Sequence, residues 1–164
     1  MTQKNIQISV EEYKSMADLP EADLILMKLA EEALNAAYAA YSHYRVGAAL
    51  RLSNGKILTG NNQENAAYPS GLCAERVAMF YAKSQFPDEN IEAIAISARS
   101  EDFTIEEAVS PCGACRQVMA EYQIQQNSPI RVVMKGEKGP LLAVNSIKAL
   151  LPLMFHAEEL KRKD

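Results

Sequence analysis

The 164-residue chain has no tryptophan, only two histidines and three cysteines, and no long run of apolar residues. Its uncharged stretches are interrupted by Asn, Ser, Gly or Pro before they reach the roughly 20 residues that a membrane-spanning helix needs. The N-terminal residues do not combine a basic flank with a following apolar stretch, so we expect no signal peptide. The sequence therefore predicts a protein without a membrane partner.

An excess of basic residues is also missing. The chain has 17 Lys and Arg against 21 Asp and Glu, which gives a formal charge of −4 at pH 7. Because non-specific binding of nucleic acid needs a basic surface, we expect no nucleic-acid partner. Three cysteines, an odd number, suit a disulfide framework poorly and suit thiols that serve chemistry or a metal in a reducing compartment. We therefore expect a cytoplasmic protein.

The residues that are present suffice for one ordinary folded domain. The apolar fraction is 48% and the charged fraction 23%, close to the globular average, so a core can form without disulfides. Helical and strand periodicities alternate along the chain, which is typical of a sheet covered by helices. We predict an α/β fold, a three-layer α/β/α sandwich with a mixed sheet of about five strands, in which residues 21–164 form one domain and residues 1–20 an N-terminal extension.

Local signals place the elements. Asp18 and Glu21 resemble a capping box in front of an amphipathic helix, and the turn Ser53–Gly55 contains the Asn-Gly pair typical of a hairpin. Ser110 and Pro111 are a typical helix start. The patterns predict helices at about 21–40, 72–84, 110–123 and from 146 to 151, and strands at about 6–10, 46–52, 56–60, 91–98, 130–134 and 141–144.

The three cysteines, Cys73, Cys112 and Cys115, each come just after a predicted helix start. There the helix dipole and unpaired N–H groups lower the pKa of a thiol. Cys112 and Cys115 are three residues apart, about 60° around a helix, so both side chains can approach one point. With Cys73 they would form a cup of three sulfurs, for which zinc is the natural occupant. Three protein ligands leave the fourth position to water, which is typical of a catalytic zinc ion.

Two neighbours of Cys73 complete this pattern. Glu75 is about 200° around an ideal helix from Cys73, so both can serve one site only if the metal lies beyond the helix end. A carboxylate that is not a ligand can then move protons, while zinc makes its bound water more acidic. Arg76 has a role in the charge balance, because three thiolates and Zn²⁺ sum to −1 and a guanidinium would withdraw charge from the sulfurs.

Five blocks of this chain resemble the cytidine deaminase family, in its compact type with three zinc-binding cysteines. They follow one another in the family's order, with matching spacing, over about 120 residues. This shared order and spacing make the resemblance highly specific, and nucleobase deaminases combine such cysteines with a non-ligand glutamate. The blocks are Tyr41-Ser42-His43-Tyr44-Arg45-Val46-Gly47-Ala48-Ala49-Leu50, Asn62–Pro69, Cys73-Ala74-Glu75-Arg76, Ser110–Val118, and Leu150–Pro152 with Phe155 and Glu158–Leu160.

The resemblance implies a function and a set of site residues. The activity would be zinc-dependent hydrolytic deamination of cytidine and 2′-deoxycytidine to uridine and 2′-deoxyuridine, with release of ammonia, in pyrimidine salvage. One zinc ion per subunit would be held by the three cysteines, and Arg76 would hydrogen-bond the sulfurs. Family members of this type are homotetramers with sites at subunit interfaces. The residues implied are Glu75 for proton transfer, Asn62 and Glu64 for the ribose, Tyr44 (where most members have Phe) for the base, Phe155 for a neighbouring subunit's site, and Ala74 as a further substrate-binding residue.

Other interpretations of the same residues stay open from sequence. A Cys-x-x-Cys pair is often a redox pair or half of a structural zinc site, and His43 or His156 could close the metal site as a fourth ligand. A deaminase of a cytosine-bearing antibiotic such as blasticidin would share the zinc blocks, and a nucleic-acid-editing deaminase is disfavoured by the acidic charge. A non-catalytic zinc module is the alternative from a different class. An exchangeable water on the metal would distinguish an enzyme from such a module.

Overall fold

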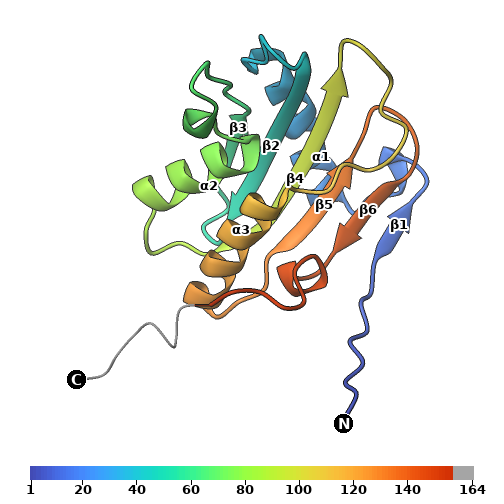
Figure 1. Ribbon diagram of the computed structural model, residues 1–164, viewed down its shortest axis with the longest axis vertical. Coiled ribbons are helices and arrows are strands. Elements are labelled where there is room, and N and C mark those ends of the chain that lie inside the picture. The colour runs from blue at the N-terminus through green and yellow to red at the C-terminus, as the bar shows by residue number, and fades with distance from the viewer. Residues whose placement is uncertain (157–164) are drawn as a thin grey trace.

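A six-stranded mixed sheet is the centre of the computed structural model, which describes residues 1–156 (Figure 1). The strands lie in the order β1-β6-β5-β4-β2-β3; β4 and β5 are parallel and the other neighbours are antiparallel. The predicted mixed sheet is confirmed, with six strands in place of about five. The strands are β1 (Glu11–Tyr13), β2 (Tyr44–Leu52), β3 (Ile57–Asn61), β4 (Ile91–Ser100), β5 (Arg131–Lys135) and β6 (Leu141–Val144).

Helices cover both faces of the sheet, which confirms the predicted α/β/α layers. In Figure 1, α1 (Glu21–Ala33) lies behind the sheet, and α2 (Ala74–Gln85) and α3 (Gly113–Gln126) lie in front of it. Met27 of α1 is fully buried in a core on one face. Met79 of α2 and Met119 of α3 are fully buried in a second core on the other face. Each helix therefore turns one apolar stripe to the sheet, as amphipathic helices do.

Two glycines let the helices lie directly on the strands. A Cβ atom at Gly47 of β2 would be 2.0 Å from the carbonyl oxygen of Ala30 in α1. A Cβ atom at Gly60 of β3 would be 2.6 Å from the carbonyl oxygen of Ala74, the first residue of α2. Only glycine avoids these clashes with backbone atoms. The second contact seats the N-terminus of α2 on the end of the β2–β3 hairpin.

The first strand lies later in the chain than its sequence pattern predicted. Residues 1–10 have no regular structure, and their alternating apolar side chains at Ile6, Ile8 and Val10 are exposed. The strand is instead Glu11–Tyr13, which pairs with β6. It is held there by charged and polar side chains, because a single guanidinium on β5 binds partners on both α1 and β1. Arg131 donates to Asp23 on α1 at 2.8 Å, to Glu11 at 2.7 Å and to the Tyr13 hydroxyl at 3.1 Å.

The first helix is shorter than predicted. It begins at Glu21, as expected, but ends at Ala33, and Leu34–Ala36 form a single 3-10 turn. Buried Leu34 and Ala37 continue the apolar spacing beyond the helix end, which is why the pattern extended to residue 40. Tyr38 then forms an isolated parallel β-bridge with Gln63.

Two terminal signals also gave the wrong local structure. The capping box forms between Ser15 and Asp18 around a 3-10 turn, whereas Glu21 begins its helix directly after Pro20. The predicted closing helix at 146–151 is only the 3-10 turn Ile147–Ala149. Pro152 disfavours a helical conformation in the residue before it, so the turn does not continue. The sequence block Glu158–Leu160 lies outside the described residues.

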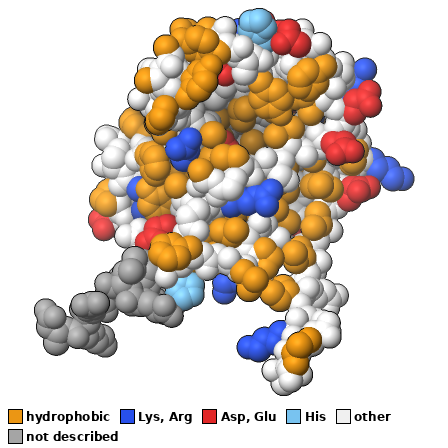
Figure 2. Space-filling model, viewed as in Figure 1, with side chains coloured by type: hydrophobic (Ala, Val, Ile, Leu, Met, Phe, Trp, Pro, Cys, Tyr) orange, Lys and Arg blue, Asp and Glu red, His pale blue; other side chains and the backbone are white. Residues whose placement is uncertain are grey.

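The face that carries α2 and α3 is rich in hydrophobic side chains. Figure 2 shows these side chains gathered over most of the face, which is hollowed in its upper half, while most acidic side chains lie toward its margin. None of the helices in residues 1–156 combines the length and apolar character needed to cross a membrane.

Candidate metal centre and adjoining cavity

The three cysteines lie together at the N-termini of α2 and α3. Cys73 and Cys112 are the N-cap residues of these helices, and Cys115 is the third residue of α3. Their sulfur atoms are all within 4.8 Å of one another, and those of Cys73 and Cys112 are 3.8 Å apart. Both helices therefore direct the positive ends of their dipoles at one group of thiols, which favours the thiolate form.

This geometry fits one zinc ion. Sulfur ligands at about 2.3 Å from zinc, arranged tetrahedrally, are about 3.8 Å from one another, which matches the distance between Cys73 and Cys112. Cys115 is buried and Cys112 is exposed, so the cluster has an accessible side. Within the described residues no histidine joins this cluster. His43 instead lies 3.4 Å from the carboxylate of Asp102.

Arginines support the thiols and the loop that carries them. Arg76 donates to the sulfur of Cys73 at 3.5 Å, the contact that the family resemblance implied. A hydrogen bond from the Cys115 thiol, together with Arg76, lowers the pKa of Cys73; the same bond and burial raise the pKa of Cys115. Arg116 was missed from sequence. It donates to the carbonyl oxygens of Pro111 at 2.8 Å and of Leu150 at 3.0 Å, and so fixes the backbone just before Cys112.

Glu75 lies beside the cysteine cluster without being part of it. Its side chain is buried and its Oε2 atom has no hydrogen-bond partner. Burial, aided by the negative charge of Cys73, raises the pKa of this carboxyl group. The angular objection from the ideal helix does not apply, because Cys73 is a cap residue with extended backbone angles (φ −71°, ψ 153°). Cys73 and Glu75 can therefore serve one site.

A cavity of about 390 Å³ opens over these groups. It contains most of the residues that the sequence suggested for substrate, but not all of them. Ala74 is fully buried in the core, and Phe155 is exposed and does not line this cavity. The lining residues are Ser42, Tyr44, Val46, Asn62, Glu64, Cys73, Glu75, Ile96, Val109, Ser110 and Cys112.

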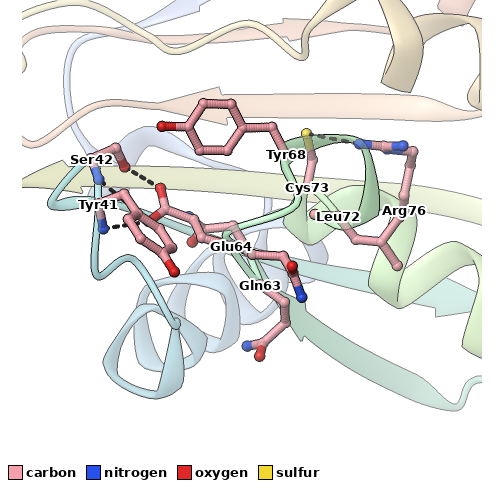
Figure 3. Close-up of a pocket in the computed structure, with 11 residues that line it drawn as sticks. Tyr41, Ser42, Gln63, Glu64, Tyr68, Leu72, Cys73 and Arg76 are labelled. Atoms are coloured by element: carbon pink, nitrogen blue, oxygen red, sulfur yellow. Dashed lines mark hydrogen bonds between the residues drawn. The ribbon is translucent and has the colours of Figure 1, made fainter.

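Glu64 lies where this cavity meets a second one of about 490 Å³, drawn in Figure 3. Its carboxylate accepts hydrogen bonds from the backbone N–H groups of Tyr41, at 2.8 Å, and Ser42, at 3.3 Å, and from the Ser42 hydroxyl. Burial opposes the charge, but these bonds outweigh it and lower the pKa of Glu64. Ser42 was not singled out from sequence, although it lies within the Tyr41–Leu50 block. Glu64 is thus ionised and already fixes the Tyr41–Ser42 turn.

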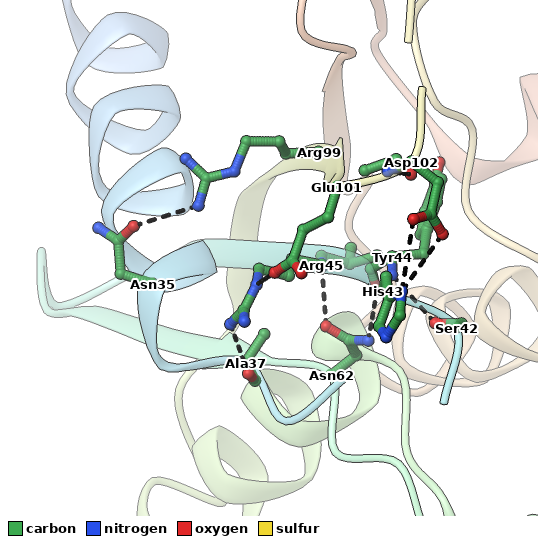
Figure 4. Close-up of polar contacts among 12 residues, drawn as sticks. Asn35, Ala37, Ser42, His43, Tyr44, Arg45, Asn62, Arg99, Glu101 and Asp102 are labelled. Carbon is green, nitrogen blue, oxygen red and sulfur yellow. Dashed lines mark hydrogen bonds and ion pairs between the residues drawn. The ribbon is translucent and has the colours of Figure 1, made fainter. Parts of the chain in front are cut away.

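Asn62 closes the other side of the same turn (Figure 4). Its Oδ1 atom accepts from the N–H of Val46 at 2.7 Å, and its Nδ2 group donates to the carbonyl oxygen of Tyr44 at 2.9 Å. The amide keeps one N–H and one lone pair for a further partner. Tyr44 follows His43, whose backbone is left-handed (φ 52°). Its half-buried ring lines the cavity, and burial raises the pKa of its hydroxyl.

Phe155 does not line the cavity of its own chain. The residue is 65% exposed, and its carbonyl oxygen accepts a hydrogen bond from Gln117 on α3 at 2.8 Å. The bond attaches the end of the described chain to the helix that carries Cys112 and Cys115.

Comparisons with known proteins agree on one family. Residues 20–128 match the family model described as "Cytidine and deoxycytidylate deaminase zinc-binding region". A cytidine deaminase of Halalkalibacterium halodurans is 38% identical over 136 residues, which cover 83% of this chain and 96% of the relative. A cytidine deaminase of Sporosarcina psychrophila is 39% identical over 135 residues, covering 82% and 92%. The crystal structure of cytidine deaminase from Burkholderia pseudomallei matches with a TM-score of 0.70 and 35% identity, over 84% of this chain and 100% of that chain.

Proposed function

This chain belongs to the cytidine deaminase family and is a hydrolase of that family, and from this premise we propose that it is a zinc-dependent enzyme acting on the free nucleosides cytidine and 2′-deoxycytidine. The products are uridine or 2′-deoxyuridine and ammonia, which places the reaction in pyrimidine salvage. The observation that carries the proposal is the arrangement of one cavity. Its lining includes Glu75, whose carboxyl Oε2 atom has no hydrogen-bond partner, the thiols of Cys73 and Cys112, and the polar pair Asn62 and Glu64.

The chemistry follows from the two kinds of group in this cavity. Zinc held by the three cysteines would act as a Lewis acid and lower the pKa of a water molecule at the site. Glu75 takes one proton from the attacking water and gives it to N3 of the cytosine ring, as the C4–O bond forms. It then transfers the second proton to the amine, and the C4–N bond breaks to release ammonia. The raised pKa of Glu75 suits a group that both accepts and returns protons.

The same lining supports a nucleoside rather than a nucleotide. Two carboxylates, those of Glu64 and Glu75, face the cavity, and the described lining contains no lysine or arginine. Arg76 is already engaged by the Cys73 sulfur. A 5′-phosphate would therefore meet negative charge without a compensating cation, which disfavours the nucleotide. Asn62 and Glu64 have remaining hydrogen-bonding capacity for ribose hydroxyl groups.

We also infer that the enzyme works as a homotetramer. The family resemblance implies a role for Phe155 in a neighbouring subunit's site, and two observations support that arrangement: Phe155 is exposed and it does not line the cavity of its own chain. Light scattering on the zinc-loaded protein measures the assembly directly. Phe155→Ala should raise the KM for cytidine if the ring contacts substrate across an interface, and a monomeric active enzyme would contradict the proposal.

The decisive experiment separates metal binding from proton transfer. Zinc-loaded wild type is incubated with cytidine while the absorbance change and ammonia release are followed. Glu75→Gln should keep its zinc and lose roughly 10²- to 10⁴-fold in kcat, the usual contribution of a general acid–base group. Glu121→Gln is the matched control, because Glu121 is exposed on α3, and it should leave kcat unchanged.

The outcomes discriminate the alternatives. Zinc-loaded wild type without turnover would indicate a non-catalytic zinc module. Glu75→Gln with more than about a tenth of the normal kcat would remove Glu75 from the mechanism, given the size of such effects. Faster deamination of blasticidin S than of cytidine would favour the antibiotic as substrate. Inhibition by micromolar single-stranded oligonucleotide would favour a nucleic-acid substrate.

A further inference from the structure

The segment between β4 and α3, residues 101–112, is held in place by the turn between β5 and β6. The carbonyl oxygen of Ile105, a buried residue, accepts hydrogen bonds from the N–H groups of Glu137 and Lys138, both at 3.0 Å. The Glu137 carboxylate in turn accepts from the N–H of Ser100 at 2.8 Å, at the end of β4. The middle and the start of the segment are thus fixed by the same turn.

Two glycines of the β5–β6 turn allow this contact. A Cβ atom at Gly136 would lie 2.2 Å from the carbonyl oxygen of Glu107, and one at Gly139 would lie 2.0 Å from that of Glu106. Gly139 also has a left-handed backbone (φ 77°), which favours glycine on its own. The segment therefore packs backbone against backbone.

This segment reaches the cavity at two places. Val109 and Ser110, near its end, line the cavity directly. Near its start, the ring of Phe103 packs against the ring of Tyr44, with centroids 6.3 Å apart and planes inclined by 37°. Tyr44 itself lines the cavity, whereas Phe103 does not. Phe103 thus packs on a ring of the cavity wall without lining the cavity itself.

The contact with Phe103 restrains the Tyr44 ring, which the hydrogen bonds of the Tyr44 backbone leave free to rotate. Hydrogen bonds hold the Tyr44 backbone at both ends, since its N–H donates to the Ser42 hydroxyl at 3.1 Å and its carbonyl accepts from Asn62. Asp102, next to Phe103, lies 3.4 Å from His43, next to Tyr44 (Figure 4). The two short segments therefore lie side by side, and Phe103 is the aromatic partner of Tyr44 within the described residues. Because Phe103 is 60% exposed, burial in the core does not account for its position.

We propose that Phe103 is a positioning residue for substrate binding, which holds the Tyr44 ring as a flat wall for the pyrimidine base. The inference rests on the proposed function. Phe103 does not line the cavity that contains Glu75, Cys73 and Cys112, so we expect its effect to be on binding and not on proton transfer. Removal of its ring lets the Tyr44 ring rotate away from the cavity wall, which weakens the binding of substrate and product alike.

Steady-state kinetics on cytidine and calorimetric binding of uridine test this role. Phe103→Ala should raise the KM, and the Kd of uridine, by roughly 3- to 10-fold, which is the range expected for one aromatic pair, while kcat changes less than about twofold. Phe103→Tyr keeps the ring and should restore wild-type values. Phe80→Ala removes an exposed phenylalanine of α2 that does not line the cavity, and should leave both constants unchanged.

A double-mutant cycle shows whether Phe103 acts through Tyr44. In a Tyr44→Ala background, Phe103→Ala should add no further increase in KM. An equal increase in both backgrounds, an unchanged KM in the single variant, or a loss confined to kcat would each overturn the proposal. Zinc content and the thermal midpoint are measured on every variant, so that a folding defect is recognised. Absence of turnover in wild type would overturn the proposed function itself, whereas normal wild-type turnover with an unchanged KM for Phe103→Ala overturns only this inference.

Discussion

Replacement of Glu64 separates a task seen in the structure from a second task that is proposed for the same carboxylate. The residue is proposed to bind the ribose, and it also accepts hydrogen bonds from Tyr41 and Ser42. The Glu64 carboxylate therefore keeps hydrogen-bond partners even when no sugar is bound. A preference for the nucleoside over the free base must then come from the additional hydrogen bond between Glu64 and the ribose. Glu64→Gln keeps one carbonyl oxygen for the turn and removes the charge. Glu64→Ala removes both the turn's acceptor and the sugar contact.

The magnitudes follow from these contacts. A hydrogen bond to a charged group is worth about 1.5–3 kcal/mol, so the loss of one such sugar contact should lower kcat/KM for cytidine by roughly 10- to 100-fold in both variants. Cytosine lacks the sugar, so its kcat/KM should change little. Glu64→Ala should also lower the free energy of unfolding by about 1–2 kcal/mol, because three donors lose their acceptor at a site that water can partly reach. Glu64→Gln should cost less than about 1 kcal/mol.

The assay compares kcat/KM for cytidine and cytosine in wild type and both variants, with urea unfolding alongside. Glu89→Ala is a matched control, because Glu89 also accepts a serine hydroxyl, that of Ser53, and does not line the cavity. An unchanged cytidine-to-cytosine ratio in Glu64→Gln would refute the sugar assignment. A ratio that falls in Glu64→Ala alone would show that the turn, and not the charge, determines the preference.

Four further outcomes are expected. Cys115→Ser should lose most of its zinc, measured by atomic absorption, and full zinc occupancy would contradict its role as a ligand. Gly136→Ala should lower the free energy of unfolding by about 1–3 kcal/mol, because its Cβ meets the carbonyl oxygen of Glu107 at 2.2 Å; an unchanged urea midpoint would be inconsistent with that contact. Arg131 and Tyr13 lower the pKa of Glu11 from 4.5 to about 2, so this stabilisation is present above pH 4.5 and lost as the pH falls toward 2; Glu11→Gln should flatten the pH dependence of unfolding in that interval, and equal slopes would refute the assignment. Finally, kcat/KM for cytidine should depend only weakly on salt, and a steep decline would indicate a polyanionic substrate.

The sequence was most informative where chemistry restricts the choice of residue. Three cysteines and one following glutamate have few alternative uses, so Cys73, Cys112, Cys115 and Glu75 could be placed at one site before the fold was known. On an ideal helix Cys73 and Glu75 point in nearly opposite directions, which was an objection to a shared site. Periodicity does not resolve the exact helix start, so this objection could not be removed from sequence. The observed helix starts two residues later than predicted, which makes Cys73 a cap and removes the objection.

Contacts between distant segments could not be predicted in the same way. Phe103 and Tyr44 are brought together by a segment whose course depends on Gly136 and Gly139, far along the chain. Arg116 was inconspicuous because its partners are backbone carbonyl groups, which no side-chain pattern reveals. The predicted end of the first helix at residue 40 was wrong for a related reason. Buried residues beyond the true helix end, Leu34 and Ala37, continue the apolar spacing of a helix.

The two helix caps at the cysteine cluster also have a consequence for folding. Cys73 and Cys112 are neighbours in space but lie 39 positions apart in sequence, with β4 between them. An ion held by both would close that loop and reduce the number of conformations open to the unfolded chain, as a disulfide does. In the chain-entropy treatment, a loop of ~40 residues corresponds to ~4 kcal/mol at 25 °C. Removal of the ion would then loosen the docking of α3 onto the sheet as well as stop the reaction.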